Sequence, residues 1–266
     1  MDFISYNGAL AGWGAEGVQR PEELVGAGFA YRKMHTLGHK VLRIDDHLDL
    51  AEQACRAMYG CGSGLTAAGL GREVAALLSR NLYPKGSVEV ILLLTPPQEG
   101  GDAAGRLLAA TRQLLYDGYA MWHDTLLAVT VTYDVPLPAW QTGASLAAHS
   151  CMLDIAGCKG ADAVISLNRD GIVTGAGEWP LFAVAGGEVF TSPIGSGFPD
   201  SVERRLGIEA CLKAGLSVME EPMEVERIRI CDELFLVDIQ GIKSIGALDG
   251  RLFSHTAARR VDVSMR

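Results

Sequence analysis

Apolar residues recur along the first third of the chain with two spacings, and these spacings distinguish helices from strands. Residues 46–59 (DHLDLAEQACRAMY) and 65–82 repeat apolar positions every three or four residues, which predicts two amphipathic helices separated by a glycine-rich break. Residues 88–95 (VEVILLLT) form a continuous apolar run that ends at Pro96 and Pro97. This run predicts a buried strand.

The rest of the chain alternates strand and helix patterns. Strands are predicted at 126–133, 163–167, 181–185, 189–191 and 233–239, and helices at 145–156 and 201–214. Gly186 and Gly187 lie between two of the strands and indicate a hairpin. Asp117-Gly118-Tyr119 is a plausible hinge, so we expect an α+β protein with two domains, residues 1–119 and 120–266.

Composition and charge narrow the classes of partner. The chain has 266 residues and a net charge of −9, which argues against nucleic acid or an anionic membrane. No segment approaches the ~20 apolar residues of a membrane span, and the first residues contain no basic start, so we expect a cytoplasmic protein. Six cysteines without a Cys-x-x-Cys pair indicate reduced, buried thiols and no metal site.

One ordered series of short motifs resembles a known family. Its central part runs from Thr142-Gly-Ala-Ser-Leu146 through Asn168-Arg-Asp-Gly171 to Gly175-Ala-Gly-Glu-Trp-Pro-Leu-Phe182. The flanking landmarks, in chain order, are Tyr6-Asn7-Gly8, Gly26–Arg32, Asp46-His47-Leu48, Asp162–Gly171, Thr191-Ser-Pro193, Gly197, Arg204 and Asp232–Leu236. Together they resemble the class IV aminotransferases, or fold type IV pyridoxal phosphate enzymes, which include branched-chain and D-amino-acid aminotransferases and aminodeoxychorismate lyase.

The resemblance implies a fold, an assembly and a cofactor. The expected fold has a small N-terminal α/β domain and a larger C-terminal mixed α/β barrel-like domain, as in D-amino-acid aminotransferase. The expected assembly is a homodimer. The family uses pyridoxal phosphate, which a lysine holds through a Schiff base.

The residues at the family's cofactor positions depart from this pattern. No lysine occurs between Gly86 and Cys158, and the Schiff-base position maps to Thr142, or to Gln141 after a one-residue slip. The glutamate that pairs with the pyridine nitrogen maps to Gly175. The phosphate contacts of the family map to Leu50, to Ser201, Val202 and Glu203, and to Ile239. A transaminase needs an amine and an acid at these places, so the cofactor site is expected to be degenerate.

A few residues remain as candidates for other chemistry. His149 and Lys243 are candidates for an acid or base, although a packed histidine and a loop-stabilising lysine are commoner outcomes. Tyr31, Arg32 and Arg204 are candidate ligand contacts, because a guanidinium binds acidic groups well.

Lys159 has the position of a helix C-terminal cation, and Glu178 and Trp179 are expected to line the surviving cavity. A dinucleotide fingerprint at Gly26–Tyr31 is a weaker alternative, because its third glycine is replaced by Tyr31.

The expectation is therefore an aminotransferase-like protein that does not transaminate, has no cofactor, and binds a small acidic ligand or a protein partner. The alternative is an active aminotransferase or aminodeoxychorismate-lyase-like enzyme that holds pyridoxal phosphate noncovalently or works by acid–base chemistry without it. A third hypothesis is a structural partner of an active paralogue.

Overall fold

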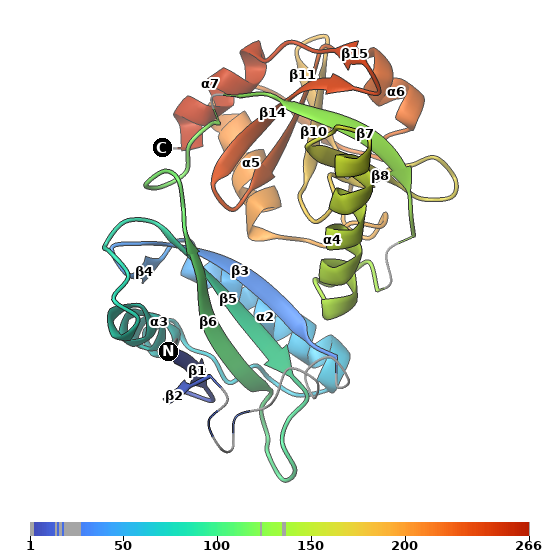
Figure 1. Cartoon of the computed structure of the whole chain (residues 1–266). Helices are drawn as coiled ribbons and strands as arrows, with labels where there is room; N and C mark the ends of the chain where they lie inside the picture. Colours follow the sequence, from blue (N-terminus) through green and yellow to red (C-terminus); the bar gives the residue numbers. More distant parts are fainter. Residues whose placement is uncertain are drawn as a thin grey trace. The chain divides into compact units, whose positions relative to one another are not determined.

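The computed structural model describes residues 3–13, 15, 18, 28–122, 124–134 and 137–265. The chain divides into two compact units, Met1–Gly118 and Tyr119–Arg266 (Figure 1). The division follows Gly118, close to the hinge predicted from Asp117-Gly118-Tyr119.

The N-terminal unit contains a six-stranded sheet in the order β2-β1-β6-β5-β3-β4. Its strands are β1 (Phe3–Tyr6), β2 (Ala9–Gly12), β3 (Ala30–Leu37), β4 (Lys40–Val41), β5 (Val88–Thr95) and β6 (Gly105–Gln113). Asn7 and Gly8 both have positive φ, as a two-residue hairpin turn between β1 and β2 requires. The apolar pattern predicted β5 but not β6.

Two helices cover this sheet. Helix α2 (Ile44–Tyr59) packs on β3, and α3 (Ala67–Arg80) packs on β1, β4 and β6. Both helices bury residues with the three- and four-residue spacing seen in the sequence; those of α3 are Leu70, Val74, Leu77 and Leu78.

The C-terminal unit contains a nine-stranded mixed sheet in the order β12-β11-β10-β13-β14-β7-β8-β9, with β15 paired to β14. Its strands are β7 (Leu126–Thr132), β8 (Ala163–Leu167), β9 (Val173–Gly175), β10 (Leu181–Ala185), β11 (Glu188–Thr191), β12 (Val218–Glu220), β13 (Glu233–Asp238), β14 (Gly241–Leu248) and β15 (Arg251–Leu252). Its helices are α4 (Gly143–Cys158), α5 (Val202–Lys213), α6 (Val225–Ile230) and α7 (Thr256–Met265).

The central strands of this sheet are buried on both faces. Along β10, Leu181 and Ala183 join one apolar core, while Phe182 and Val184 join another that includes residues of α5 and α7. The Phe182 ring stacks on Phe235 of β13 in this second core, with centroids 5.1 Å apart. Burial on both faces explains why these strands read as apolar runs rather than as alternating patterns.

Helix α4 packs on β7 and β8 through only part of its surface. It buries His149, Met152 and Ala156, whereas Cys151 and Cys158 are exposed. All six cysteines are free thiols; Cys55, Cys211 and Cys231 are buried as expected, Cys61 is half-buried, and the expectation of burial is wrong for Cys151 and Cys158. The apolar sequence of α4 suggested burial, but the helix has only one packed face. Within the described parts of the chain, none of the helices has the length and apolarity that a membrane span requires.

Candidate functional site

Position 142, where the resemblance places the reactive lysine, is a helix cap. Thr142 precedes α4, its Oγ1 accepts the Ser145 N–H at 3.4 Å, and its own N–H donates to Ser145 Oγ at 2.9 Å. This reciprocal pair is a capping box. Thr142 and Gln141 are both buried, at 3% and 6% exposure, and neither residue has an amine. The side chain at this position therefore stabilises the start of α4.

Position 175, where the resemblance places an acid, has no room for any side chain. Gly175 ends β9 with a φ of +148°, and a Cβ built there would lie 2.5 Å from Cδ2 of Phe198 and 3.1 Å from the Trp179 carbonyl oxygen. Phe198 is itself only 4% exposed. The aromatic ring thus fills the space that a side chain on residue 175 would need. Phe198 could not be identified from the sequence, because nothing local connects it to position 175.

The N-terminus of α5 is hydrogen-bonded within the chain. The Ser201 N–H donates to Asp200 Oδ1 at 2.9 Å, and the Arg204 N–H donates to Ser201 Oγ at 3.1 Å. Glu203 lies in the first turn of the helix and is 6% exposed, so a buried carboxylate stands where anions usually bind. Val202 is also buried.

Arg204, expected as a ligand contact, is buried and engaged. Its Nη2 donates to the Ser192 carbonyl oxygen at 3.2 Å and forms an ion pair with Glu220. The guanidinium therefore ties α5 to the segment after β11 and to β12.

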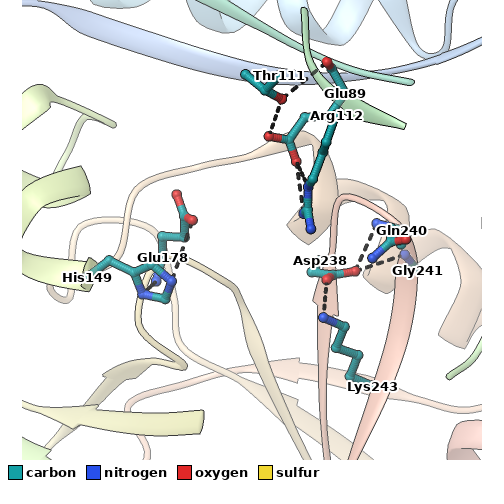
Figure 2. Close-up of polar contacts among 9 residues, drawn as sticks. All are labelled: Glu89, Thr111, Arg112, His149, Glu178, Asp238, Gln240, Gly241 and Lys243. Atoms are coloured by element: carbon teal, nitrogen blue, oxygen red, sulfur yellow. Dashed lines mark hydrogen bonds and ion pairs between the residues drawn. The ribbon is translucent and has the colours of Figure 1, made fainter. Parts of the chain in front are cut away.

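The turn from β13 to β14 is organised by Asp238 (Figure 2). One oxygen of this carboxylate accepts the N–H groups of Gln240 at 2.8 Å and Gly241 at 3.2 Å. The other lies 2.7 Å from Lys243 Nζ, which also lies 4.1 Å from the centroid of the Trp122 ring. Ile239 is buried at 1% exposure. Lys243 thus stabilises this turn.

His149 and Glu178 face each other in Figure 2. The Glu178 N–H donates to His149 Nδ1 at 3.1 Å, and His149 Nε2 lies 3.5 Å from a Glu178 carboxylate oxygen. Because Nδ1 accepts, its lone pair is occupied and the ring proton of the neutral form is on Nε2. A Cβ on Gly177 would lie 2.1 Å from Nδ1, so this glycine is needed for the histidine to pack.

The two candidate acid–base residues border one small cavity of the C-terminal unit. His149 and Lys243 line a space of about 130 Å³ together with Trp179, Ala176 and Asp162. This volume is below the ~300–1,000 Å³ of typical sites for drug-sized ligands. It has room for roughly four waters at ~30 Å³ each or for a small chemical group.

In the N-terminal unit, the predicted contacts lie in the interior. Tyr31 and Arg32 belong to β3 and are 0% and 3% exposed. Arg32 Nη2 donates to the carbonyl oxygen of Leu50, which is itself buried on α2. The pKa of His47 is lowered from 6.5 to about 3. The largest cause is burial, and the next is the positive charge of Arg32. A neutral histidine therefore accompanies the buried guanidinium.

Another polar cluster of the N-terminal unit, around Glu89, was not predicted from the sequence. Glu89 of β5 accepts a hydrogen bond from Thr111 Oγ1 at 2.7 Å and pairs with Arg112 at 3.0 Å, both residues of β6 (Figure 2). This cluster depends on the register between β5 and β6, which places Glu89 opposite Arg112.

The dinucleotide alternative can be compared with the described residues. Gly26 and Ala27 of the dinucleotide-like segment lie outside them, but Ala30–Leu37 forms β3, antiparallel to β5. A dinucleotide fingerprint requires a glycine turn that leads into a helix, so that alternative is wrong. In the described parts of the chain, no group of three or more His, Cys, Asp or Glu residues could hold a metal ion.

Comparisons with known proteins identify the fold. The family model for amino-transferase class IV matches residues 32–238. A branched-chain aminotransferase from Thermoproteus uzoniensis, solved with norvaline, is similar at 21% identity with a TM-score of 0.82, covering 100% of this chain and 94% of that one. The pyridoxal phosphate form of the enzyme from Thermobaculum terrenum is similar at 18% identity with a TM-score of 0.80, covering 99% and 92%.

The branched-chain aminotransferase of Escherichia coli is similar at 17% identity with a TM-score of 0.79, covering 97% of this chain and 92% of that one. A search of the curated proteins found no match. At these identities the solved structures establish the fold alone, and the expected two-part fold type IV architecture is confirmed.

Proposed function

Because this chain belongs to the class IV aminotransferase family, we propose that it keeps the family's fold but does not catalyse pyridoxal phosphate-dependent transamination. The observation that carries the proposal is position 142, where a buried threonine caps α4. The chemistry needs a lysine amine at this place to hold the cofactor and move a proton. A hydroxyl used as a helix cap supplies neither function.

The other cofactor positions support the same proposal. Bound pyridoxal phosphate acts as an electron sink, and an acid beside its ring nitrogen strengthens that effect. Gly175 has no side chain and Phe198 fills the adjoining space. At the phosphate end, Glu203 is a buried carboxylate, and Leu50 and Ile239 are buried apolar residues. We therefore propose that the residues present do not fit the cofactor.

We propose that the chain forms a homodimer. The dimer would bind either a small acidic molecule or a protein partner. The dimer is an inference from the family. Arg32 and Arg204 remain the arginines that an acidic ligand would approach, although both are buried and already bonded. Light scattering on a size-exclusion column tests the dimer, and co-purification with a lysine-containing relative would favour a structural partnership instead.

One observation favours a second candidate function, acid–base catalysis without the cofactor. His149 and Lys243 border the same cavity, so a small substrate there would lie beside two groups that can move protons. Both groups are engaged, since His149 Nδ1 accepts from Glu178 and Lys243 pairs with Asp238. Turnover of amino acids or of a chorismate-like acid that is lost in both His149→Ala and Lys243→Ala would support this candidate.

The test of the leading proposal is a half-reaction assay. Purified protein is incubated with pyridoxal phosphate, desalted, mixed with branched-chain and D-amino acids, and followed by visible absorbance and by oxo-acid formation. We expect no retained chromophore and no oxo acid. Oxo-acid formation above the rate of free cofactor would contradict the proposal.

A further inference from the structure

Two backbone elements of the C-terminal unit have the form of anion sites, and in both of them side-chain oxygens of the chain accept backbone N–H groups. Helix N-termini and tight turns present N–H groups that bind phosphate or other anions. At the start of α5, Asp200 accepts the N–H of the capping residue Ser201, and the Ser201 hydroxyl accepts the Arg204 N–H of the first turn. After β13, Asp238 accepts the N–H groups of Gln240 and Gly241.

The two arginines at the start of α5 form ion pairs with carboxylates of the chain. Asp200 pairs with Arg205 at 2.8 Å, and Arg204 pairs with Glu220. Glu203 adds a third carboxylate, buried in the first turn. Arg204 and Arg205 are thus each already paired with a carboxylate, so a phosphate dianion approaching this helix would have to compete with these acids for its cations.

The charges at the second element also form an ion pair. Asp238 has a side chain that is 3% exposed, and Lys243 lies against it with a side chain 18% exposed. Among the described residues of this turn, the cation is Lys243. It pairs with Asp238, the same carboxylate that accepts the two backbone N–H groups. An incoming phosphate would have to displace a buried acid from three donors.

We infer that Asp200, Glu203 and Asp238 take the place of a phosphate group in this unit, so the ligand of the inherited pocket contains no phosphate. This inference deepens the proposed function and rests on it. If so, the polar groups of these two elements are already bonded within the chain when no ligand is bound. A protein that binds a phosphorylated cofactor would instead leave such groups for the phosphate. Ligands without phosphate, including amino acids and oxo acids, remain compatible.

The experiment removes the carboxylate charges and measures phosphate binding. Glu203→Gln and Asp238→Asn keep the size of each side chain and delete one negative charge, and Asp238→Asn also releases Lys243 from its ion pair. Glu188→Gln, at an exposed position of β11, is the matched control for the change in net charge. Binding of inorganic phosphate and of pyridoxal phosphate is measured by thermal shift and by calorimetry at constant ionic strength.

We expect no shift in the melting temperature of the wild-type protein with either compound at millimolar concentration. Asp238→Asn is expected to bind inorganic phosphate at least tenfold more tightly than Glu188→Gln, which removes the same single charge. If Asp238→Asn fails to fold, Glu203→Gln alone is compared with the control. Stabilisation of the wild type by phosphate, or variants that bind no better than the control, would overturn the inference.

The outcome is separable from that of the proposed function. Phosphate-dependent stabilisation without oxo-acid formation would refute this inference alone. Transamination that unphosphorylated pyridoxal supports as well as pyridoxal phosphate does would refute the proposed function and leave this inference standing, because the phosphate would contribute no binding.

Discussion

Placing a side chain on residue 175 tests directly whether the acid position is closed. Gly175→Ala adds one methyl group that would lie 2.5 Å from Phe198 Cδ2, at a φ of +148° that L-residues rarely adopt. The unfavourable backbone conformation costs about 1–3 kcal/mol. Overpacking against a buried ring adds roughly 1–3 kcal/mol. We therefore expect Gly175→Ala to lower the free energy of unfolding by about 4 kcal/mol, the sum of the two costs near their middle values.

The matched control is Gly187→Ala in the β10–β11 hairpin. Gly187 has a φ of +86°, but a Cβ added to it would meet no atom within 4 Å, so only the backbone cost applies, at about 1–2 kcal/mol. Both variants are measured by urea unfolding with circular dichroism. A Gly175→Ala variant no less stable than Gly187→Ala would refute the claim that the position is closed.

A double-mutant cycle identifies Phe198 as the cause. Phe198→Ala alone should cost about 3–5 kcal/mol, because it empties a buried site. The double variant with Gly175→Ala should be more stable than the sum of the two losses predicts, by about 1–3 kcal/mol, because the clash is gone. Additivity within about 0.5 kcal/mol would mean that the ring is not the obstacle.

Three further predictions concern other parts of the chain. Because the His47 pKa is lowered to about 3, the unfolded chain binds an extra proton between that pH and 6.5. Unfolding free energy should therefore fall by about 1.4 kcal/mol per unit as the pH drops through this window, and His47→Gln should remove that contribution in urea titrations at several pH values. Thr142→Ala should cost about 1 kcal/mol through loss of the cap, whereas an equally destabilised Thr142→Ser would contradict the capping role. Lys243→Met leaves the Asp238 carboxylate without its cation and should cost roughly 2–4 kcal/mol in the same assay, while a neutral result would show that the pair contributes nothing.

Local patterns identified many of the elements. Helices α2 and α3 have the predicted apolar spacing, and β5 and β13 were visible as apolar runs. Strand β3 was not, because its sequence AYRKMHTL places charged residues among the apolar ones. Arg32 is tolerated in this buried strand because its guanidinium donates a hydrogen bond to the Leu50 carbonyl oxygen. The spacing of residues in the sequence cannot reveal this contact.

Some features of the candidate site could be predicted from the sequence, and others could not. The threonine at 142 and the glycine at 175 could be read from the order of motifs, because each substitution is a property of one residue. The ring of Phe198 against Gly175 could not be, because it depends on how β9 and the segment before α5 fold together. The role of Asp238 could not be predicted either, since one carboxylate near the end of a predicted strand does not reveal the three groups that it contacts.

Covalent trapping tests the central claim most directly. The chain has six lysines, Lys33, Lys40, Lys85, Lys159, Lys213 and Lys243, so borohydride reduction in the presence of pyridoxal phosphate followed by peptide mass spectrometry surveys every side-chain amine. We predict only scattered, substoichiometric modification that rises linearly with cofactor concentration. Stoichiometric, saturable labelling of a single lysine would contradict the claim that this chain has lost the covalent cofactor site.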